Sequence, residues 1–173
     1  GMTLSGGEPI MQPDFSATLV AEAKKMGIHT TVETANHGPW ESLWQVVERA
    51  DLVLLDIKIM DPKLHEKYTG VPNDLILDNA IKVARMNKRV VGRVPIVPKY
   101  NDDWDNLAET AMFCKKAGME AMHLLPYHRL GEGKYKKLGR KYKLVDVLSP
   151  SREELRRTAT RIQDEFGIPV LVM

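Results

Sequence analysis

The feature that most constrains the fold is a repeated alternation of two patterns along the chain. Short apolar, β-branched runs predict strands, and longer segments with apolar residues every three or four positions predict helices that bury one face. Strands that alternate with helices are typical of an α/β fold on a parallel sheet, because each helix connects two parallel strands. We therefore expect repeated strand–helix units with five or six strands.

The clearest strand is residues 52–55, where LVLL is continuously apolar, as in a strand that is covered on both faces. Further strands are predicted at 28–34, 90–97, 121–125 and 169–172. Helices are predicted at 15–26, 40–50, 62–70, 74–84, 104–111 and from 151 onward. In the helix at 40–50, one face with aromatic residues is expected to pack on the sheet: Trp40, Leu43, Trp44 and Val47. Residues 131–146 show neither pattern and are predicted to form a functional loop.

The length and composition favour one ordinary domain. The 173 residues, 43% of them hydrophobic, can bury a core without disulfides or a structural metal, so a single domain over residues 1–173 is expected. Basic and acidic residues number 25 and 23, and the formal net charge of +2 does not indicate a nucleic-acid partner. No apolar run is long enough to cross a bilayer, and the first residues do not resemble a signal peptide, so no membrane partner is expected.

Cys114 is the only cysteine of the chain. A single cysteine excludes an internal disulfide and a metal site made only of this chain's cysteines. It agrees with a reducing compartment, so a cytoplasmic location is expected. Its helical spacing from Ala111 predicts a small buried apolar residue rather than a nucleophile. Gly1 before Met2 reads as a residue left by tag removal, so the start of the chain is predicted to be artificial.

Polar residues lie at four strand ends, the first of them belonging to a strand of which this sequence contains almost nothing. These groups are Gly6-Gly7-Glu8, Glu33-Thr34, Asp56 with Lys58, and Pro126-Tyr127-His128. In a parallel sheet the carboxyl ends of the strands lie along one edge, so we expect these groups to converge on one site.

The chemistry of two of these groups suits an amino-acid ligand. Adjacent glycines let a ligand approach the backbone closely, and the carboxylate of Glu8 can accept from an ammonium group. Asp56 and Lys58 alternate with Ile57, so they face the same side, where they can form an ion pair or hold the two ends of a ligand. Structural alternatives stay open: a tight turn that needs glycine, a partly buried ion pair, and for His128 a satisfied structural histidine.

A basic segment lies late in the chain. Residues 134–143 contain six lysine or arginine residues and two tyrosines. The sequence favours a solvated loop, with contact to a large protein substrate as the alternative. The remaining histidines show no metal-ligand spacing, so no zinc site is expected.

Six motifs in order resemble one family, the radical S-adenosylmethionine activating enzymes of glycyl radical enzymes, particularly the pyruvate formate-lyase activase type. The motifs are LSGGEP at 4–9, GIHTTVET at 27–34, DLVLLDIK at 51–58, HEKYTGVPN at 65–73, RVPIVPKYND at 93–102 and LLPYHRLGEGKY at 124–135. The resemblance implies a partial (β/α)6 radical SAM barrel, an incomplete TIM-like barrel that lacks its N-terminal strand–helix unit. An open sheet edge would favour self-association of the chain.

The resemblance also implies a set of site residues. The cofactor-binding set is Gly6, Gly7, Glu8, Thr34, Asp56, Ile57, Lys58 and His128. In this reading the Gly-Gly-Glu turn receives the methionine amino group of S-adenosylmethionine, Lys58 lies near its carboxylate, and His128 flanks the nucleoside. Glu33 and Asp56, with Thr34 and the backbone of Leu54, would hold a monovalent cation. Glu33 stands where the family's pattern has aspartate, so its oxygens are shifted by one methylene.

In the family, a [4Fe-4S] cluster on a Cys-x3-Cys-x2-Cys loop reduces S-adenosylmethionine, and the 5'-deoxyadenosyl radical removes a hydrogen from a backbone glycine of a glycyl radical enzyme such as pyruvate formate-lyase. This chain contains no such loop. We therefore expect a fragment of the enzyme that is inactive by itself, with the cluster and a flavodoxin or ferredoxin-type electron donor belonging to the parent protein.

Three alternatives stay open, the first within the same class and the other two in different classes. The chain can belong to an activase of a different glycyl radical enzyme, because the upstream part that would distinguish them is not in this sequence. It can be a non-catalytic barrel that binds S-adenosylmethionine or a protein without a cluster. An ordinary phosphate-binding (β/α) barrel is disfavoured, because no glycine-rich phosphate loop follows the late strands.

Overall fold

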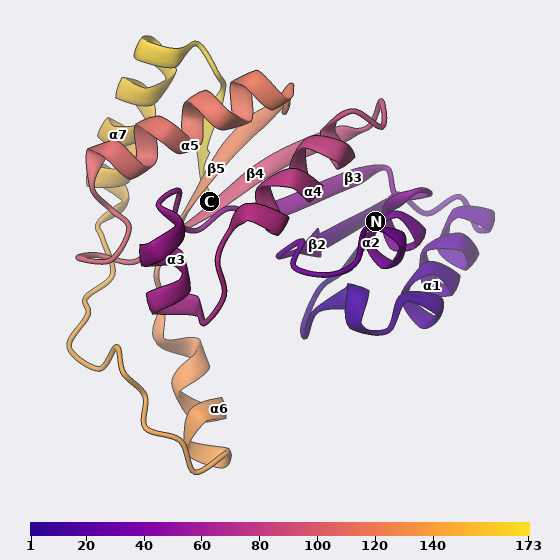
Figure 1. Ribbon diagram of the computed structural model, residues 1–173, viewed down its shortest axis with the longest axis horizontal. Helices are drawn as coiled ribbons and strands as arrows, with labels where there is room; N and C mark the ends of the chain where they lie inside the picture. The colour runs from indigo at the N-terminus through magenta and orange to yellow at the C-terminus, as the bar shows by residue number, and fades with distance from the viewer.

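The fold is built on a six-stranded parallel sheet, seen in a computed structural model that describes residues 1–173 (Figure 1). The strands are β1 (Met2–Leu4), β2 (Thr30–Thr34), β3 (Leu52–Asp56), β4 (Arg89–Ile96), β5 (Ala121–Pro126) and β6 (Val170–Val172). Their spatial order is the sequence order, β1-β2-β3-β4-β5-β6, and every neighbouring pair is parallel. β1 and β6 lie at opposite edges and do not pair, so the sheet is not closed. The α/β class and the incomplete barrel are confirmed.

Helices connect the strands. They are α1 (Pro13–Lys25), α2 (Trp40–Val47), α3 (Pro62–Thr69), α4 (Asp74–Ala84), α5 (Trp104–Ala117), α6 (Glu132–Lys137) and α7 (Arg152–Phe166), with short 3-10 turns at Pro9–Met11 and Arg129–Gly131. The predicted loop at 131–146 is partly wrong, because it contains α6. This six-residue helix has little apolar periodicity for a sequence pattern to reveal.

Local capping signals explain where several helices begin and end. The side chain of Asp61 accepts from the amide of Leu64 at the start of α3, and Gly70 ends that helix in the left-handed conformation at φ 93°. Ser151 and Glu154 form a reciprocal capping box at the start of α7. These two helix starts were predicted from the sequence, and both are confirmed.

The hydrophobic core lies between the helices and one face of the sheet. Alternate strand residues on this face are almost fully buried, among them Val32, Val53, Leu55, Val94 and Leu124, each at 0% exposure. They belong to one cluster with apolar residues of α1, α2, α4, α5 and α7. The core therefore fixes the sheet from one side.

The opposite face of the sheet carries polar side chains. On β2, β3, β4 and β5 this face includes Glu33, Asp56, Arg93 and His123, all half-buried, and the last three lie in one register row. Half-buried charges need partners or water, so this face differs in kind from the core face. The prediction that 52–55 is covered on both faces is therefore wrong for Leu52 and Leu54, which are only half-buried.

Two sequence expectations about helix faces are also corrected. Trp44 does not pack on the sheet, since it is 44% exposed, whereas Leu43 and Val47 of the same predicted face are buried, together with Val46. Phe15, the first apolar residue of the helix predicted at 15–26, is 61% exposed rather than packed on the sheet. The helical spacing of apolar residues spans a wider face than the part that is buried, so the spacing alone does not show which of these residues contact the sheet. None of the helices is long and apolar enough to cross a membrane.

Candidate functional site

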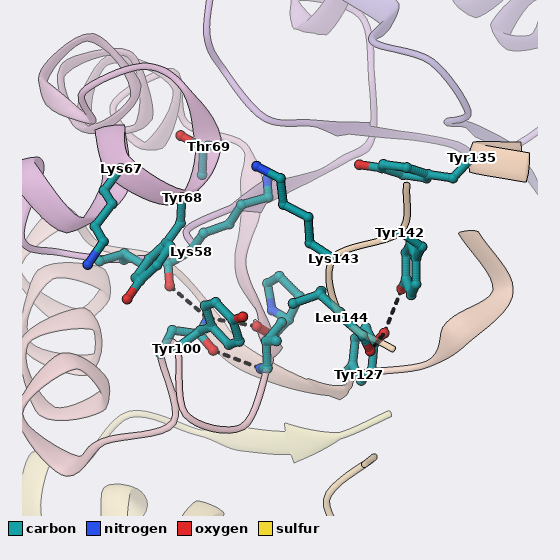
Figure 2. Close-up of a pocket in the computed structure, with 14 residues that line it drawn as sticks. Lys58, Lys67, Tyr68, Thr69, Tyr100, Tyr127, Tyr135, Tyr142, Lys143 and Leu144 are labelled. Atoms are coloured by element: carbon teal, nitrogen blue, oxygen red, sulfur yellow. Dashed lines mark hydrogen bonds between the residues drawn. The ribbon is translucent and has the colours of Figure 1, made fainter. Parts of the chain in front are cut away.

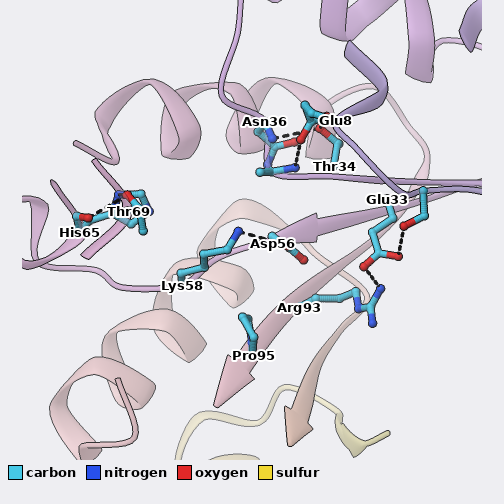
Figure 3. A network of polar contacts seen from close by, with 12 residues as sticks. Glu8, Glu33, Thr34, Asn36, Asp56, Lys58, His65, Thr69, Arg93 and Pro95 are labelled. Atoms are coloured by element: carbon cyan, nitrogen blue, oxygen red, sulfur yellow. Dashed lines mark hydrogen bonds and ion pairs between the residues drawn. The ribbon is translucent and has the colours of Figure 1, made fainter. Parts of the chain in front are cut away.

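The predicted site groups do converge on one edge of the sheet. Because all six strands are parallel, their carboxyl ends lie along the same edge, where Gly6, Thr34, Asp56 and Tyr127 lie at or just after the ends of β1, β2, β3 and β5. Figure 3 shows the polar side chains that gather there. The convergence predicted from the sequence is confirmed, whereas the ligand roles of these residues stay predictions.

The Gly6-Gly7 turn is exposed and open to a ligand. Gly6 has φ +117°, a conformation that only glycine adopts readily, and a Cβ added at either glycine would meet no atom within 4 Å. No backbone hydrogen bond within the chain involves Gly6 or Gly7. The turn therefore presents free amide and carbonyl groups at the edge of the sheet.

The carboxylate of Glu8 ties this turn to the end of β2. It accepts from the hydroxyl of Thr34 (2.6 Å), the amide of Ala35 (2.8 Å) and, more weakly, the amide of Ile10 (3.4 Å). The Thr34 hydroxyl in turn accepts from the amide of Asn36 (3.0 Å). Glu8 was predicted to accept from a ligand's ammonium group, but its two oxygens already have three donors of this chain. The predicted site residues Glu8 and Thr34 thus contact one another.

A buried asparagine pair follows this network. Asn36 has φ 59°, and its backbone carbonyl accepts from the side-chain amide of Asn79 on α4 (2.8 Å), which also donates to the carbonyl of Gly38 (3.0 Å). Asparagine tolerates this left-handed conformation better than most residues do. The pair links the segment after β2 to α4, and the sequence reading gave it no role.

Asp56 and Lys58 form an ion pair, one of the two arrangements that their spacing predicted. The distance from Lys58 Nζ to Asp56 Oδ2 is 3.1 Å, and their side chains are 33% and 25% exposed. Ile57, between them, points into the core at 1% exposure, and its amide donates to the carbonyl of Arg93 (2.8 Å). Ile57 therefore has only its carbonyl to offer a ligand. Asn101 holds the segment by donating to the carbonyl of Lys58 (2.8 Å).

Glu33, predicted as a cation ligand with Asp56, forms an ion pair with Arg93 of β4 and also accepts from the Ser5 hydroxyl (3.0 Å). Both predicted carboxylates thus contact cationic side chains of this chain. The sequence reading missed Arg93, although its position two residues after Val91 on a predicted strand placed it on the same face. No group of three or more His, Cys, Asp or Glu side chains is placed to hold a metal ion.

A pocket of about 490 Å³ opens beside Lys58 (Figure 2). Its walls come from the ends of β3 and β4, from α3 and from the segment after β5. The polar or aromatic lining residues are Lys58, Lys67, Tyr68, Thr69, Tyr100, Asn101, Tyr127, Tyr135, Tyr142 and Lys143. No carboxylate lines the pocket. It is therefore suited to an anionic or carboxylate-bearing group.

His128 lies at this edge but outside that pocket. It is exposed, and it precedes the turn at Arg129–Gly131 without capping it through its side chain. Its neighbour Tyr127 is buried and donates or accepts in a 2.5 Å hydrogen bond with the hydroxyl of Tyr142. Burial, and next the bond to Tyr127, raises the pKa of Tyr142 to about 12. The side chain of His128 is exposed to solvent, and its ligand role stays a prediction.

Cys114 has the environment of a packing residue. It is fully buried on α5, and burial raises the pKa of its thiol to about 12. Cluster ligation requires several accessible thiolates in one loop. The residues of this chain therefore do not fit an iron–sulfur cluster, and the prediction that Cys114 is a buried apolar residue is confirmed.

Comparison with known proteins identifies relatives of this chain. The model of the radical SAM superfamily matches residues 1–111. The (2S)-3-sulfopropanediol dehydratase activating enzyme of Klebsiella oxytoca is 41% identical over 150 residues, 85% of this chain and 47% of the relative. The (2S)-3-sulfopropanediol sulfolyase activating enzyme of Bilophila wadsworthia (strain 3_1_6) is 44% identical over 150 residues, 85% and 49% of the two chains.

A third relative is the 4-hydroxyphenylacetate decarboxylase activating enzyme of Clostridioides difficile (strain CD196), 36% identical over 168 residues, 96% of this chain and 52% of the relative. The chain thus spans about half the length of the curated relatives that it matches.

Solved structures of two other proteins share this fold. A domain of a pyruvate-formate lyase-activating enzyme from Bacteroides vulgatus ATCC 8482 superimposes with a TM-score of 0.80 at 28% identity, covering 100% of this chain and 98% of that one. Streptococcus suis SuiB bound to S-adenosylmethionine has a TM-score of 0.74 at 17% identity, covering 99% of this chain and 37% of SuiB, and shows likeness of fold alone. Since the superfamily model covers most of the chain and the fold agrees, this chain belongs to the radical SAM superfamily.

Proposed function

We propose that this chain is the part of a glycyl radical enzyme activating enzyme that binds S-adenosylmethionine and receives the partner enzyme. The observation that carries the proposal is the agreement of three relatives, 36–44% identical, that are all named as activating enzymes. Their named partners differ, so the identity of this chain's partner, pyruvate formate-lyase or another glycyl radical enzyme, is left to experiment.

The residues at the carboxyl edge support binding of S-adenosylmethionine. In our proposal the backbone of Gly6 and Gly7 meets the methionine amino group through the free carbonyl groups of the turn. Glu8 contributes by holding that turn against β2, since its carboxylate is bonded to Thr34 and Ala35. Lys58 can turn from Asp56 to the carboxylate of the ligand, because the ion pair is partly exposed and therefore easily exchanged.

His128 is proposed to flank the nucleoside, as its exposed imidazole allows. Asp56 and the carbonyl of Ile57 lie next to Lys58 and would border the same ligand. The monovalent cation site on Glu33 and Asp56 stays a sequence prediction outside this proposal, because both carboxylates already contact cationic side chains.

When S-adenosylmethionine is bound and reduced, it supplies the hydrogen-abstraction chemistry of the superfamily. This chain would contribute position and exclusion of water rather than acid or base catalysis. Because its only cysteine is buried, we propose that the cluster ligands and the contact with an electron donor belong to other residues of a longer protein.

Titration calorimetry of S-adenosylmethionine into the 173-residue chain tests the binding part. Gly7→Ala should abolish or strongly weaken binding, because the added methyl group meets nothing in the fold but occupies the approach to the turn. Gly131→Ala is the matched control, since its methyl group also meets nothing within 4 Å. Lys58→Met should weaken binding, and Lys63→Met on the exposed side of α3 should not. Unchanged affinity in Gly7→Ala and Lys58→Met would refute this placement of the ligand.

Anaerobic reconstitution with iron and sulfide tests the activating-enzyme part. This chain is compared with a longer version that includes a cysteine loop. A reducible cluster and cleavage of S-adenosylmethionine only in the longer protein would support the proposal. If neither protein takes up a cluster but S-adenosylmethionine still binds, a non-catalytic binding domain is favoured instead.

A further inference from the structure

Positive charge is concentrated in one segment, residues 129–148, which we call the basic arm. The basic arm contains seven basic and two acidic residues, a formal charge of +5, whereas the other 153 residues contain 18 basic and 21 acidic residues, a charge of −3. Only Arg129 among the seven is in an ion pair, with Glu132 at 2.9 Å. The overall charge of +2 therefore hides a strongly dipolar molecule.

The basic arm lies at the edge of the sheet formed by the carboxyl ends of the strands. It follows β5, and in Figure 1 its helix α6 projects away from the layer of helices that covers the core. Three of its residues, Tyr135, Tyr142 and Lys143, line the pocket that also contains Lys58. In Figure 2, Lys58 and Lys143 reach into the pocket from different walls. A molecule held by the basic arm is therefore held beside the candidate ligand site.

The arm also offers apolar anchors. Leu130 and Leu138 are 82% and 61% exposed, and Leu138 directly follows Lys136 and Lys137, which have no carboxylate partner. Leu148, 83% exposed, lies at the far end of the arm, after Asp146. Exposed leucines next to charged side chains are typical of a protein interface with an apolar centre and a polar rim.

The tyrosines favour a peptide over a nucleic acid as the occupant. Tyr135 and Tyr142 pack edge to face, with centroids 5.2 Å apart, and Tyr68 and Tyr100 do the same at 5.0 Å. Such pairs cover part of the ring faces on which bases would stack. The hydroxyls of Tyr68, Tyr100 and Tyr135 and the lysines of the pocket remain as hydrogen-bond donors for carboxylates, whereas the Tyr142 hydroxyl is bonded to Tyr127.

We propose that the basic arm and the pocket beneath it form the docking site for an acidic, leucine-bearing segment of the protein partner. This inference rests on the proposed function only in taking the partner to be a protein. Carboxylates of the segment contact the lysines of the arm and pocket, and its apolar side chains contact the exposed leucines. Docking there presents the partner to the Gly6-Gly7 edge and raises the rate of encounter through charge attraction.

Fluorescence anisotropy with a labelled peptide rich in glutamate and leucine tests the proposal. The intact chain should bind this peptide and not its glutamine-for-glutamate counterpart, with an affinity that falls as salt is added. The variant Lys136→Glu, Lys137→Glu and Lys141→Glu should bind at least about tenfold more weakly. The charge-matched control reverses Lys116, Arg152 and Arg156, which are exposed residues outside the arm, and should bind almost as the intact chain does.

Competition separates the possible occupants. Single-stranded DNA or anionic phosphatidylserine vesicles that bind the arm more tightly than the acidic peptide would overturn the proposal in favour of a nucleic acid or a membrane surface. If the arm variant and its charge-matched control lose the same amount of peptide affinity, the effect is one of net charge alone, and the proposal is overturned as well. Calorimetry with S-adenosylmethionine on the arm variant keeps the two proposals distinct, because cofactor binding that persists while peptide binding is lost separates docking from the proposed ligand site.

Discussion

Replacing Glu8 should destabilise the fold, because its carboxylate joins the turn after β1 to the end of β2. Two of its hydrogen bonds are short, at 2.6 Å from Thr34 and 2.8 Å from Ala35, and the bond from Ile10 at 3.4 Å is weak. A hydrogen bond to a charged group contributes about 1.5–3 kcal/mol. Since Glu8 is only half-buried and water can replace part of the loss, we expect Glu8→Ala to lower the free energy of unfolding by about 2–3 kcal/mol.

Glu8→Gln should lower the free energy of unfolding by less, about 1 kcal/mol. The side-chain oxygen of glutamine still accepts one of the hydrogen bonds, whereas its NH2 group faces a donor where the second carboxylate oxygen was. Thr34→Val removes the hydroxyl that donates to Glu8 and accepts from Asn36. The double variant with Glu8→Ala should therefore cost about 1 kcal/mol less than the sum of the two single variants.

Urea denaturation, followed by circular dichroism, measures these free energies. Glu109→Ala is the control, since Glu109 is exposed on α5 and has no side-chain hydrogen bond or ion pair. A Glu8→Ala protein as stable as the control, or strict additivity with Thr34→Val, would show that the Glu8 bonds do not hold the turn. Its carboxylate would then be free to contact the ligand's amino group, as the sequence alone suggested.

Three further predictions concern packing, reactivity and acid stability. Gly92→Ala should destabilise the fold by about 1–3 kcal/mol in urea denaturation, because overpacking a core forces side chains to shift. Its Cβ would lie 2.6 Å from Cys114 Sγ, so the cost should shrink in a Cys114→Ala background, whereas Gly133→Ala, which meets no atom, should not destabilise. Burial raises the pKa of the Cys114 thiol to about 12, so a thiol reagent should not modify it at pH 8 until urea unfolds the chain. Rapid labelling of the native protein would contradict this burial. The hydrogen bond from Lys24 holds the pKa of Asp51 in the folded protein below its ordinary value of 3.8. The stability that Asp51 contributes is therefore complete above pH 3.8 and is lost as the pH falls toward the pKa of the folded state. Asp51→Asn should be less stable at pH 7 but lose less stability between pH 5 and 3, and parallel pH profiles would refute this.

Local patterns determined most of the secondary structure. The run at 52–55 is part of β3, and the helices predicted from 62 and from 151 begin there, at the capping residues Asp61 and Ser151. Signals of this kind lie within one helical turn or one strand, where the physical cause and the sequence pattern coincide. The pattern of alternation also gave the parallel sheet, and parallel strands place their carboxyl ends along one edge whatever their sequence.

The tertiary structure decided which polar groups are free. Glu33 meets Arg93 because strands β2, β3 and β4 are adjacent in a definite register, and Glu8 meets Thr34 across 26 positions of sequence. No local pattern reports such partners, since strand register sets them. The charge of the basic arm could be read from the sequence, but only the fold places Lys143 beside Lys58 at one pocket. The sequence thus determined which residues reach the carboxyl edge of the sheet, and the packing of distant segments decided which of them are already bonded within the chain.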